Sequence, residues 1–187
     1  MAMSVEVLTD FLLILLTSEF LCTIIEIDTG VPVDVILMPG EQTMLYSDLT
    51  KKAMLFAYRA HEGQVDKGGL PYIFHPLAVA EMMGDDEDAV VVALLHDVIE
   101  DTSITAQDLL CAGFSDAVVH SVVSISRRPG EAYMAYLRRV KDDVLARKVK
   151  LGDLKHNSDL GRLQFVDEHA ISLHKRYQKA IAFLSED

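Results

Sequence analysis

Cysteine is scarce in this 187-residue chain, which contains only Cys22 and Cys111. Two distant cysteines provide no disulfide framework and no CxxC pair of the kind that holds structural zinc. The chain does not need such cross-links, because a domain of this length can bury a sufficient core and half of the residues are hydrophobic. The composition therefore predicts one domain that folds by packing alone in a reducing cytoplasm.

Basic residues are also in the minority. The chain has 17 Lys and Arg against 29 Asp and Glu, a formal net charge of −12. Residues 1–50 contain no Lys or Arg and eight acids, so the charge divides into −8 for this segment and −4 for residues 51–187. A nucleic-acid partner requires a basic surface that neutralises phosphates, and the charge balance argues against one.

The apolar run FLLILLTSEFLCTII lacks the features of an export signal or membrane span. Asp10 precedes it, Glu19 interrupts it and no positively charged region comes before it, so we predict no membrane association. The segments IIEIDTG and VPVDVILMPG are rich in β-branched residues and predict a short strand or hairpin. Because the charged, helical part opens at Met44, we expect residues 1–43 to be an extension of unknown role and residues 44–187 to be the functional domain.

No alternating strand pattern, internal repeat or low-complexity segment occurs after residue 44. Apolar residues instead recur at helical spacing between helix-end signals. Ser47 is a plausible N-cap, Pro76 suits a first helical position, and Gly84 follows the end of the same helix. The segment AVVVALLHDVIED is the most hydrophobic and predicts the central helix. The whole pattern predicts an all-α, bundle-like domain.

Four ionisable residues follow this buried run in the sequence LHDVIEDT, namely His96, Asp97, Glu100 and Asp101. Buried charge is costly unless it has a partner or a ligand. Adjacent helical residues point about 100° apart, yet His96 and Asp97 can both converge on an ion beside the helix. An ordinary helix-end ion pair is the alternative explanation of a His-Asp pair.

A metal ion would account for the pair together with two distant residues. His61, at the predicted end of one helix, and Asp153, on another, complete a set of two imidazoles and two carboxylates. This set suits Mn²⁺, Fe²⁺ or Zn²⁺, and such an ion activates water and polarises a phosphoryl oxygen. Glu100 lies one turn after His96, where it can orient or deprotonate that water.

Four segments together resemble the hydrolase domain of RelA/SpoT-type alarmone enzymes, a branch of the HD phosphohydrolase superfamily. They are AHEGQ, KGGLPYIFHP, LLHDVIEDT and KLGDLKHN, which occur in the family's order and approximate spacing. The resemblance spans roughly residues 47–180. It implies an all-α HD-domain helical bundle, a Mn²⁺-dependent site, and removal of the 3′-pyrophosphate from ppGpp or pppGpp to give GDP or GTP. It also leads us to expect a stand-alone small alarmone hydrolase.

The resemblance further implies a role for individual residues. The family's metal ligands fall on His61, His96, Asp97 and Asp153. Its catalytic acidic pair falls on Glu100 and Asp101, and its nucleotide contacts fall on Lys67, Asn157 and Tyr177. His75, which precedes Pro76 in the family's HP motif, is expected to shape the loop or to support a ligand from behind. We expect the same of His156, or a place on the surface.

Three positions depart from the family pattern. Asp66 stands where the family has an arginine, Gly68 where a serine is common, and Gly152 where an alanine is usual. An arginine gives phosphate a fork of charge-assisted hydrogen bonds, whereas an aspartate repels it. This exchange costs on the order of a few kcal/mol, or roughly a hundredfold in affinity, and therefore bears on substrate identity.

Two other functions stay open. The first is an HD phosphohydrolase that acts on another nucleotide or small phosphoester, which Asp66 favours. The second is a nucleotide-binding module with weak catalysis, which the intact Glu100 and Asp101 disfavour. A small-molecule nucleotide is the expected partner in each case, and the sequence makes no prediction of oligomeric state.

Overall fold

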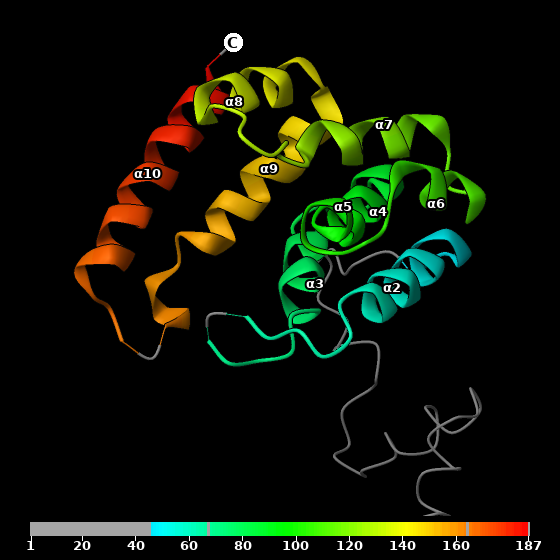
Figure 1. Ribbon diagram of the computed structural model, residues 1–187, viewed down its shortest axis with the longest axis horizontal. Helices are drawn as coiled ribbons and strands as arrows, with labels where there is room; N and C mark the ends of the chain where they lie inside the picture. Colours follow the sequence, from blue (N-terminus) through cyan, green and yellow to red (C-terminus); the bar gives the residue numbers. More distant parts are fainter. Residues whose placement is uncertain (1–45, 67, 164, 187) are drawn as a thin grey trace, which may run out of the picture. The chain divides into compact units, whose positions relative to one another are not determined.

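The computed structural model describes residues 46–66, 68–163 and 165–186. The predicted extension over residues 1–43, with its strand or hairpin, lies outside these ranges. The described residues fold into helices joined by short loops (Figure 1), with the bounds α2 (Asp48–Ala60), α3 (Phe74–Glu81), α4 (Glu87–Leu95), α5 (Val98–Asp101), α6 (Ala106–Cys111), α7 (Asp116–Ile125), α8 (Tyr133–Asp142), α9 (Val144–Asn157) and α10 (Glu168–Ser185). Within the described ranges, the only β pairing is an isolated bridge between Val65 and Pro71. The predicted all-α class is confirmed.

Side-chain caps fix where the helices begin. The Ser47 side chain accepts a hydrogen bond from the N–H of Thr50 at the start of α2, and Asp86 does the same for α4. Thr105 forms a capping box with Asp108 at α6. These bonds satisfy N–H groups that lack partners within the helix, so local sequence sets the helix starts.

The start of α3 differs from the prediction by two residues. The helix begins at Phe74, so Pro76 occupies its third position rather than its first. This position is still tolerated, because the N–H groups of the first turn have no partner within the helix. Gly84 follows the helix with a φ of +70°, a left-handed conformation that favours glycine.

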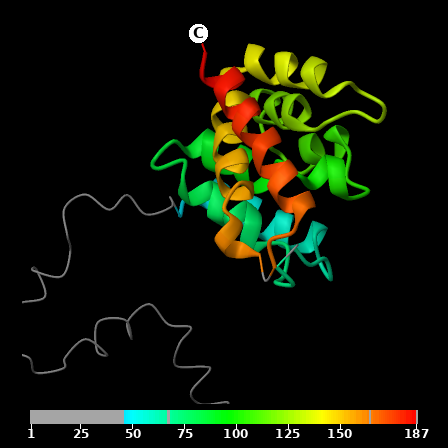
Figure 2. The same cartoon turned by 90° about the vertical axis from the view of Figure 1, so that its left-hand side faces the viewer.

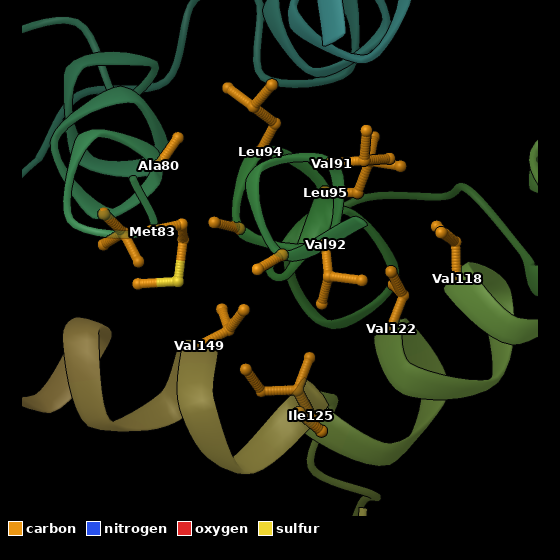
Figure 3. Packing of buried hydrophobic residues seen from close by; sticks show 14 of the residues in the cluster. Ala80, Met83, Val91, Val92, Leu94, Leu95, Val118, Val122, Ile125 and Val149 are labelled. Carbon is orange, nitrogen blue, oxygen red and sulfur yellow. The ribbon is translucent and has the colours of Figure 1, made fainter. Parts of the chain in front are cut away.

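The central helix is α4, as predicted. Every residue from Ala89 to Leu95 is buried, because α2, α3, α7 and α9 pack around the helix. Figure 3 shows Val92 and its neighbours on α4 between Met83 of the turn after α3, Val149 of α9 and Val122 of α7. This core holds α3 and α9 beside the end of α4.

The predicted single helix AVVVALLHDVIED is broken in the structure. It ends at Leu95 and resumes as α5 at Val98, with His96 and Asp97 in the turn between. On a continuous helix these two side chains would diverge by about 100°, whereas the turn brings both to one cluster. The break therefore serves the site.

Helices α9 and α10 run antiparallel and side by side, as the views in Figures 1 and 2 both show. The Arg147 side chain of α9 donates to the carbonyl of Leu184, and Lys141 of α8 donates to the carbonyl of Phe183. These bonds fasten the C-terminal end of α10, whose other end borders the pocket described below. Among the described helices, none has the length and apolarity needed to cross a membrane.

Candidate active site

Four buried or half-buried side chains meet where α3, the α4–α5 turn and α9 converge. Nε2 of His75 lies 3.1 Å from Oδ1 of Asp153 and 3.6 Å from Oδ2 of Asp97. Nε2 of His96 lies 3.0 Å from Oδ2 of Asp97 and 3.8 Å from Oδ1 of Asp153. His75, His96 and Asp153 each offer one potential ligand atom, and these atoms lie within 4.8 Å of one another.

This cluster fits a divalent metal ion. Ligand atoms about 2.1 Å from one ion lie roughly 3.0 to 3.5 Å apart at octahedral and tetrahedral angles, which is close to the spacing found here. Nε2 of His96 is buried and has no hydrogen-bond partner among the described residues, although Asp97 is near. The other ring nitrogen, Nδ1, lies 2.7 Å from the carbonyl oxygen of Ala93. That bond places a proton on Nδ1 and turns Nε2 toward the two carboxylates, where it can bind a cation in place of its own proton.

The charges of the cluster favour binding of a cation. Burial alone would raise the pKa of Asp97, but His96 outweighs it and lowers the pKa. Burial likewise opposes ionisation of Asp153, but the Lys150 ammonium, 2.6 Å away, holds its pKa well below the usual range. Burial lowers the pKa of His96, yet Asp97 and Asp153 together raise it to about 10. The two carboxylates are therefore ionised and create a negative potential that attracts a cation.

The structure gives His61 a different neighbourhood. It caps the end of α2, where its Nδ1 lies 2.8 Å from Oε1 of Gln64, and its ring lies 4.8 Å from the ring of Tyr72. In the described ranges, no hydrogen bond or ion pair joins His61 to Asp97 or Asp153. Its Nε2 is nevertheless buried without a partner among these residues, so the ligand role of His61 stays a prediction.

The structure brings His75 into the cluster. We expected it to shape the loop or to act from behind a ligand, but its Nε2 lies within the cluster. Its Nδ1 lies 2.7 Å from Nδ1 of His156, and the two rings are stacked. Burial, Arg162 and His75 lower the pKa of His156 to about 4, so this ring is neutral and can accept a proton shared with His75. The HP motif was the signal that could have identified His75.

The acidic pair lies beside the cluster at the pocket wall. Oε2 of Glu100 accepts a hydrogen bond of 2.7 Å from the backbone N–H of Arg127. The Tyr72 hydroxyl lies between Asp97 and Asp101 and donates to both. Partial burial and the charge of Asp97 raise the pKa of Glu100 and of Asp101. Each carboxyl is therefore better able to exchange a proton than an exposed one.

A pocket of about 620 Å³ opens over the cluster and the acidic pair. This volume is in the range of small-molecule sites. Two of the three predicted nucleotide contacts, Asn157 and Tyr177, line it, and Asn157 donates a hydrogen bond to Asp153. The third, Lys67, lies outside the described residues. The lining also includes Lys150 and Arg162, which sequence reasoning did not select.

Comparisons with known proteins agree with the fold. The family described as HD domain matches residues 53–147. A GTP pyrophosphokinase of Myxococcus xanthus is 33% identical over 127 residues, which are 59% of this chain and 17% of the relative. The bifunctional (p)ppGpp synthase/hydrolase SpoT of Escherichia coli K12 is 35% identical over 133 residues, 62% of this chain and 19% of the relative. The chain thus spans less than a fifth of the length of either relative.

A solved structure also matches. It is described as a metazoan ortholog of SpoT that hydrolyzes ppGpp and plays a role in starvation responses, and it superposes with a TM-score of 0.62 at 22% identity. The match covers 75% of this chain and 86% of that one. It establishes that the two proteins share a fold.

Proposed function

We propose a phosphohydrolase function from the premise that this chain belongs to the HD domain family. The proposed activity is removal of the 3′-pyrophosphate of guanosine tetraphosphate or pentaphosphate (ppGpp or pppGpp), which leaves GDP or GTP. The observation that carries it is the buried cluster of two histidines and two aspartates, with two further acids, at the base of one pocket. Relatives with more than 30% identity whose names include (p)ppGpp hydrolysis support the choice of substrate.

In this proposal His75, His96, Asp97 and Asp153 hold the ion. The predicted set changes in one member, since His75 replaces His61 on the grounds of its distances to both aspartates. A divalent ion there, Mn²⁺ in the first place with Fe²⁺ or Zn²⁺ as alternatives, would polarise the phosphoryl group and acidify water. Lys150 would keep Asp153 ionised and oriented.

The acidic pair would move the protons. Water attacks the phosphorus that is bonded to the ribose 3′ oxygen, and the bond between that phosphorus and that oxygen breaks. Glu100, held by the N–H of Arg127, takes a proton from the attacking water. Asp101, which accepts a hydrogen bond from Tyr72, returns a proton to the leaving oxygen. The raised pKa of each carboxyl suits this exchange.

The remaining predicted residues would bind the nucleotide. Asn157 and Tyr177 lie in the lining of the pocket, and Lys67, which is outside the described residues, follows Asp66 in the sequence. We also propose that residues 44–187 form the catalytic domain and residues 1–43 an extension, which agrees with a family match confined to residues 53–147. The scarcity of cysteine supports a cytoplasmic location.

Hydrolysis of another nucleotide or small phosphoester is the second candidate. It is favoured by Asp66, which lines the pocket at the position where the related enzymes are expected to carry an arginine. A carboxylate there changes the charge that a polyphosphate meets. The two candidates share the metal site and differ only in the ligand.

The test is pyrophosphate release from ppGpp by the full chain, with added Mn²⁺ and after chelation, beside GTP, GMP and dAMP. Metal-dependent release from ppGpp alone is the expected result. Cleavage of another compound with no pyrophosphate release from ppGpp would support the second candidate function. Asp97→Asn should be inactive, and Asp85→Asn, at an exposed loop position that does not line the pocket, is the matched control.

A further inference from the structure

The side chain of Asp66 forms an ion pair with Arg162 in the lining of the pocket. Nη2 of Arg162, in the short 3₁₀ helix Leu160–Arg162, lies 2.7 Å from Oδ2 of Asp66, in the loop that precedes α3. Both residues line the pocket above the metal-binding cluster. The Asp66 side chain is 9% exposed and that of Arg162 is 25% exposed. The ion pair therefore joins two walls of the pocket that lie 96 positions apart in the sequence.

The carboxylate of Asp66 is fully engaged. Its Oδ1 accepts hydrogen bonds from the N–H groups of Gly68 (2.8 Å) and Leu70 (3.0 Å), and its Oδ2 faces Arg162. Burial would raise the pKa of Asp66, but these partners outweigh it and lower the pKa. Asp66 is thus a fixed anion whose charge is directed at a guanidinium. A bare aspartate would repel phosphate, but this one is neutralised by its partner.

Two hydrogen bonds hold the guanidinium of Arg162 in place and leave other N–H donors unused. Its Nη1 donates to the carbonyl of His156 over 3.2 Å, and the ring of His156 is stacked on His75 in the cluster. These two bonds, the ones found in the described part of the chain, use two of the five N–H groups of the guanidinium. The others are available to a ligand in the pocket. Because both anchors fix its plane, the side chain loses little further entropy on binding.

Gly68 fits the same arrangement. A Cβ atom at this position would lie 3.1 Å from the carbonyl oxygen of Arg162 and 3.2 Å from Oδ1 of Asp66. The backbone oxygen cannot move away as the end of a flexible side chain would. A serine at position 68 would therefore crowd the contact between the two walls. The two departures of this loop from the related enzymes, at positions 66 and 68, are thus explained by one partner, Arg162.

We infer that Arg162 is a phosphate-binding residue of this pocket and that Asp66 is its positioning residue. The arginine expected in the loop before α3 is supplied instead by the 3₁₀ helix Leu160–Arg162, and the loop carries the carboxylate that orients it. Identification of the ligand as a guanosine polyphosphate rests on the proposed function. The inference itself concerns any phosphate group bound beside the cluster.

The test compares variants of the full chain in the ppGpp assay with Mn²⁺. Arg162→Ala should raise KM at least tenfold and change kcat less than threefold, because it removes binding and leaves the reacting groups. Arg162→Lys should give a smaller rise, since it keeps the charge without the fork. Asp66→Asn should also raise KM, because the guanidinium loses its charged anchor. Arg138→Ala is the control, at an exposed arginine of α8 outside the pocket lining.

Direct binding of inorganic pyrophosphate, measured by calorimetry in the presence of a chelator, separates this inference from the proposed function. Weaker binding by Arg162→Ala, in a protein that does not cleave ppGpp, would support the inference while the proposed function fails. Active enzyme with unchanged KM and pyrophosphate affinity in Arg162→Ala would overturn it. A loss confined to kcat would overturn it as well, because it would show that the arginine does not contribute to binding of the phosphate groups.

Discussion

Replacing His75 with asparagine removes the imidazole nitrogen that lies 3.1 Å from Asp153 and 3.6 Å from Asp97. The ion should then lose one of four ligands. Loss of a residue that only supports a ligand from behind weakens metal binding about 10- to 100-fold. Loss of a ligand itself should therefore lower metal affinity about a hundredfold or more. The matched comparison is His61→Asn, which removes another buried histidine, whose Nδ1 contacts the side chain of Gln64 rather than the cluster.

The expected effect can be stated as a thermal shift. Mn²⁺ at a hundred times its dissociation constant stabilises the folded chain by about 2.7 kcal/mol. For a domain of this size, each kcal/mol raises Tm by about 2–4 °C, so the wild-type shift should be about 5–11 °C. At the same concentration, a hundredfold weaker site stabilises by only about 0.4 kcal/mol, which is a shift of about 1–2 °C.

The assay is thermal denaturation of each variant with and without Mn²⁺, so that each protein is its own reference. This design matters because His75→Asn also loses the contact with His156. Loss of that contact lowers the Tm of the metal-free protein but does not by itself change the shift that Mn²⁺ produces. We expect His61→Asn to keep the full shift. If His75→Asn keeps the full shift and His61→Asn loses it, the ligand assignment from geometry is refuted and the one from sequence stands.

Three further outcomes are expected. Asp97→Asn should abolish ppGpp cleavage and reduce bound Mn²⁺ measured by elemental analysis; full activity with bound metal would remove Asp97 from the site. The pKa of Glu100 is raised and a base must be ionised to act, so kcat/KM should fall as pH drops through a value above 4.5. Glu100→Gln should lose this acidic limb of the pH profile together with at least a hundredfold in kcat. An identical pH profile in the variant would exclude Glu100 as the base. Gly152→Ala should stabilise the chain by up to about 1 kcal/mol in denaturant unfolding. The one short contact of the new Cβ is with the terminal methyl of Met83, at 2.8 Å, whereas those with Val79 (3.5 Å) and Met82 (3.9 Å) are ordinary. A loss of stability would show that this methyl cannot move.

Local features of the fold were predictable from the sequence because they depend on neighbouring residues. The caps at Ser47 and Thr105 are set by side chains within three positions of the N–H groups they accept from. The central place of α4 follows from an unbroken apolar run, which cannot leave any face exposed to water. His96 and Asp97 could be selected for the same reason, since ionisable residues directly after such a run are rarely free of function.

The choice between His61 and His75 could not be made in this way. Both histidines lie at helix ends, and only the packing of α3 against α4 and α9 decides which one reaches Asp153. The pairing of Asp66 with Arg162 was hidden for a similar reason. Read alone, Asp66 is a charge that repels phosphate, and its partner becomes visible only when the two walls of the pocket are assembled.

The residues of the cluster come from α3, the α4–α5 turn and α9, and this origin has a consequence for chain integrity. The exposed turn around Gly130, between α7 and α8, divides the chain so that His75, His96 and Asp97 lie on one side and Asp153 on the other. Two fragments cut at this turn would each carry an incomplete ligand set. The ion would then act as a non-covalent link between them, and Mn²⁺ concentration would set the extent of their reassembly.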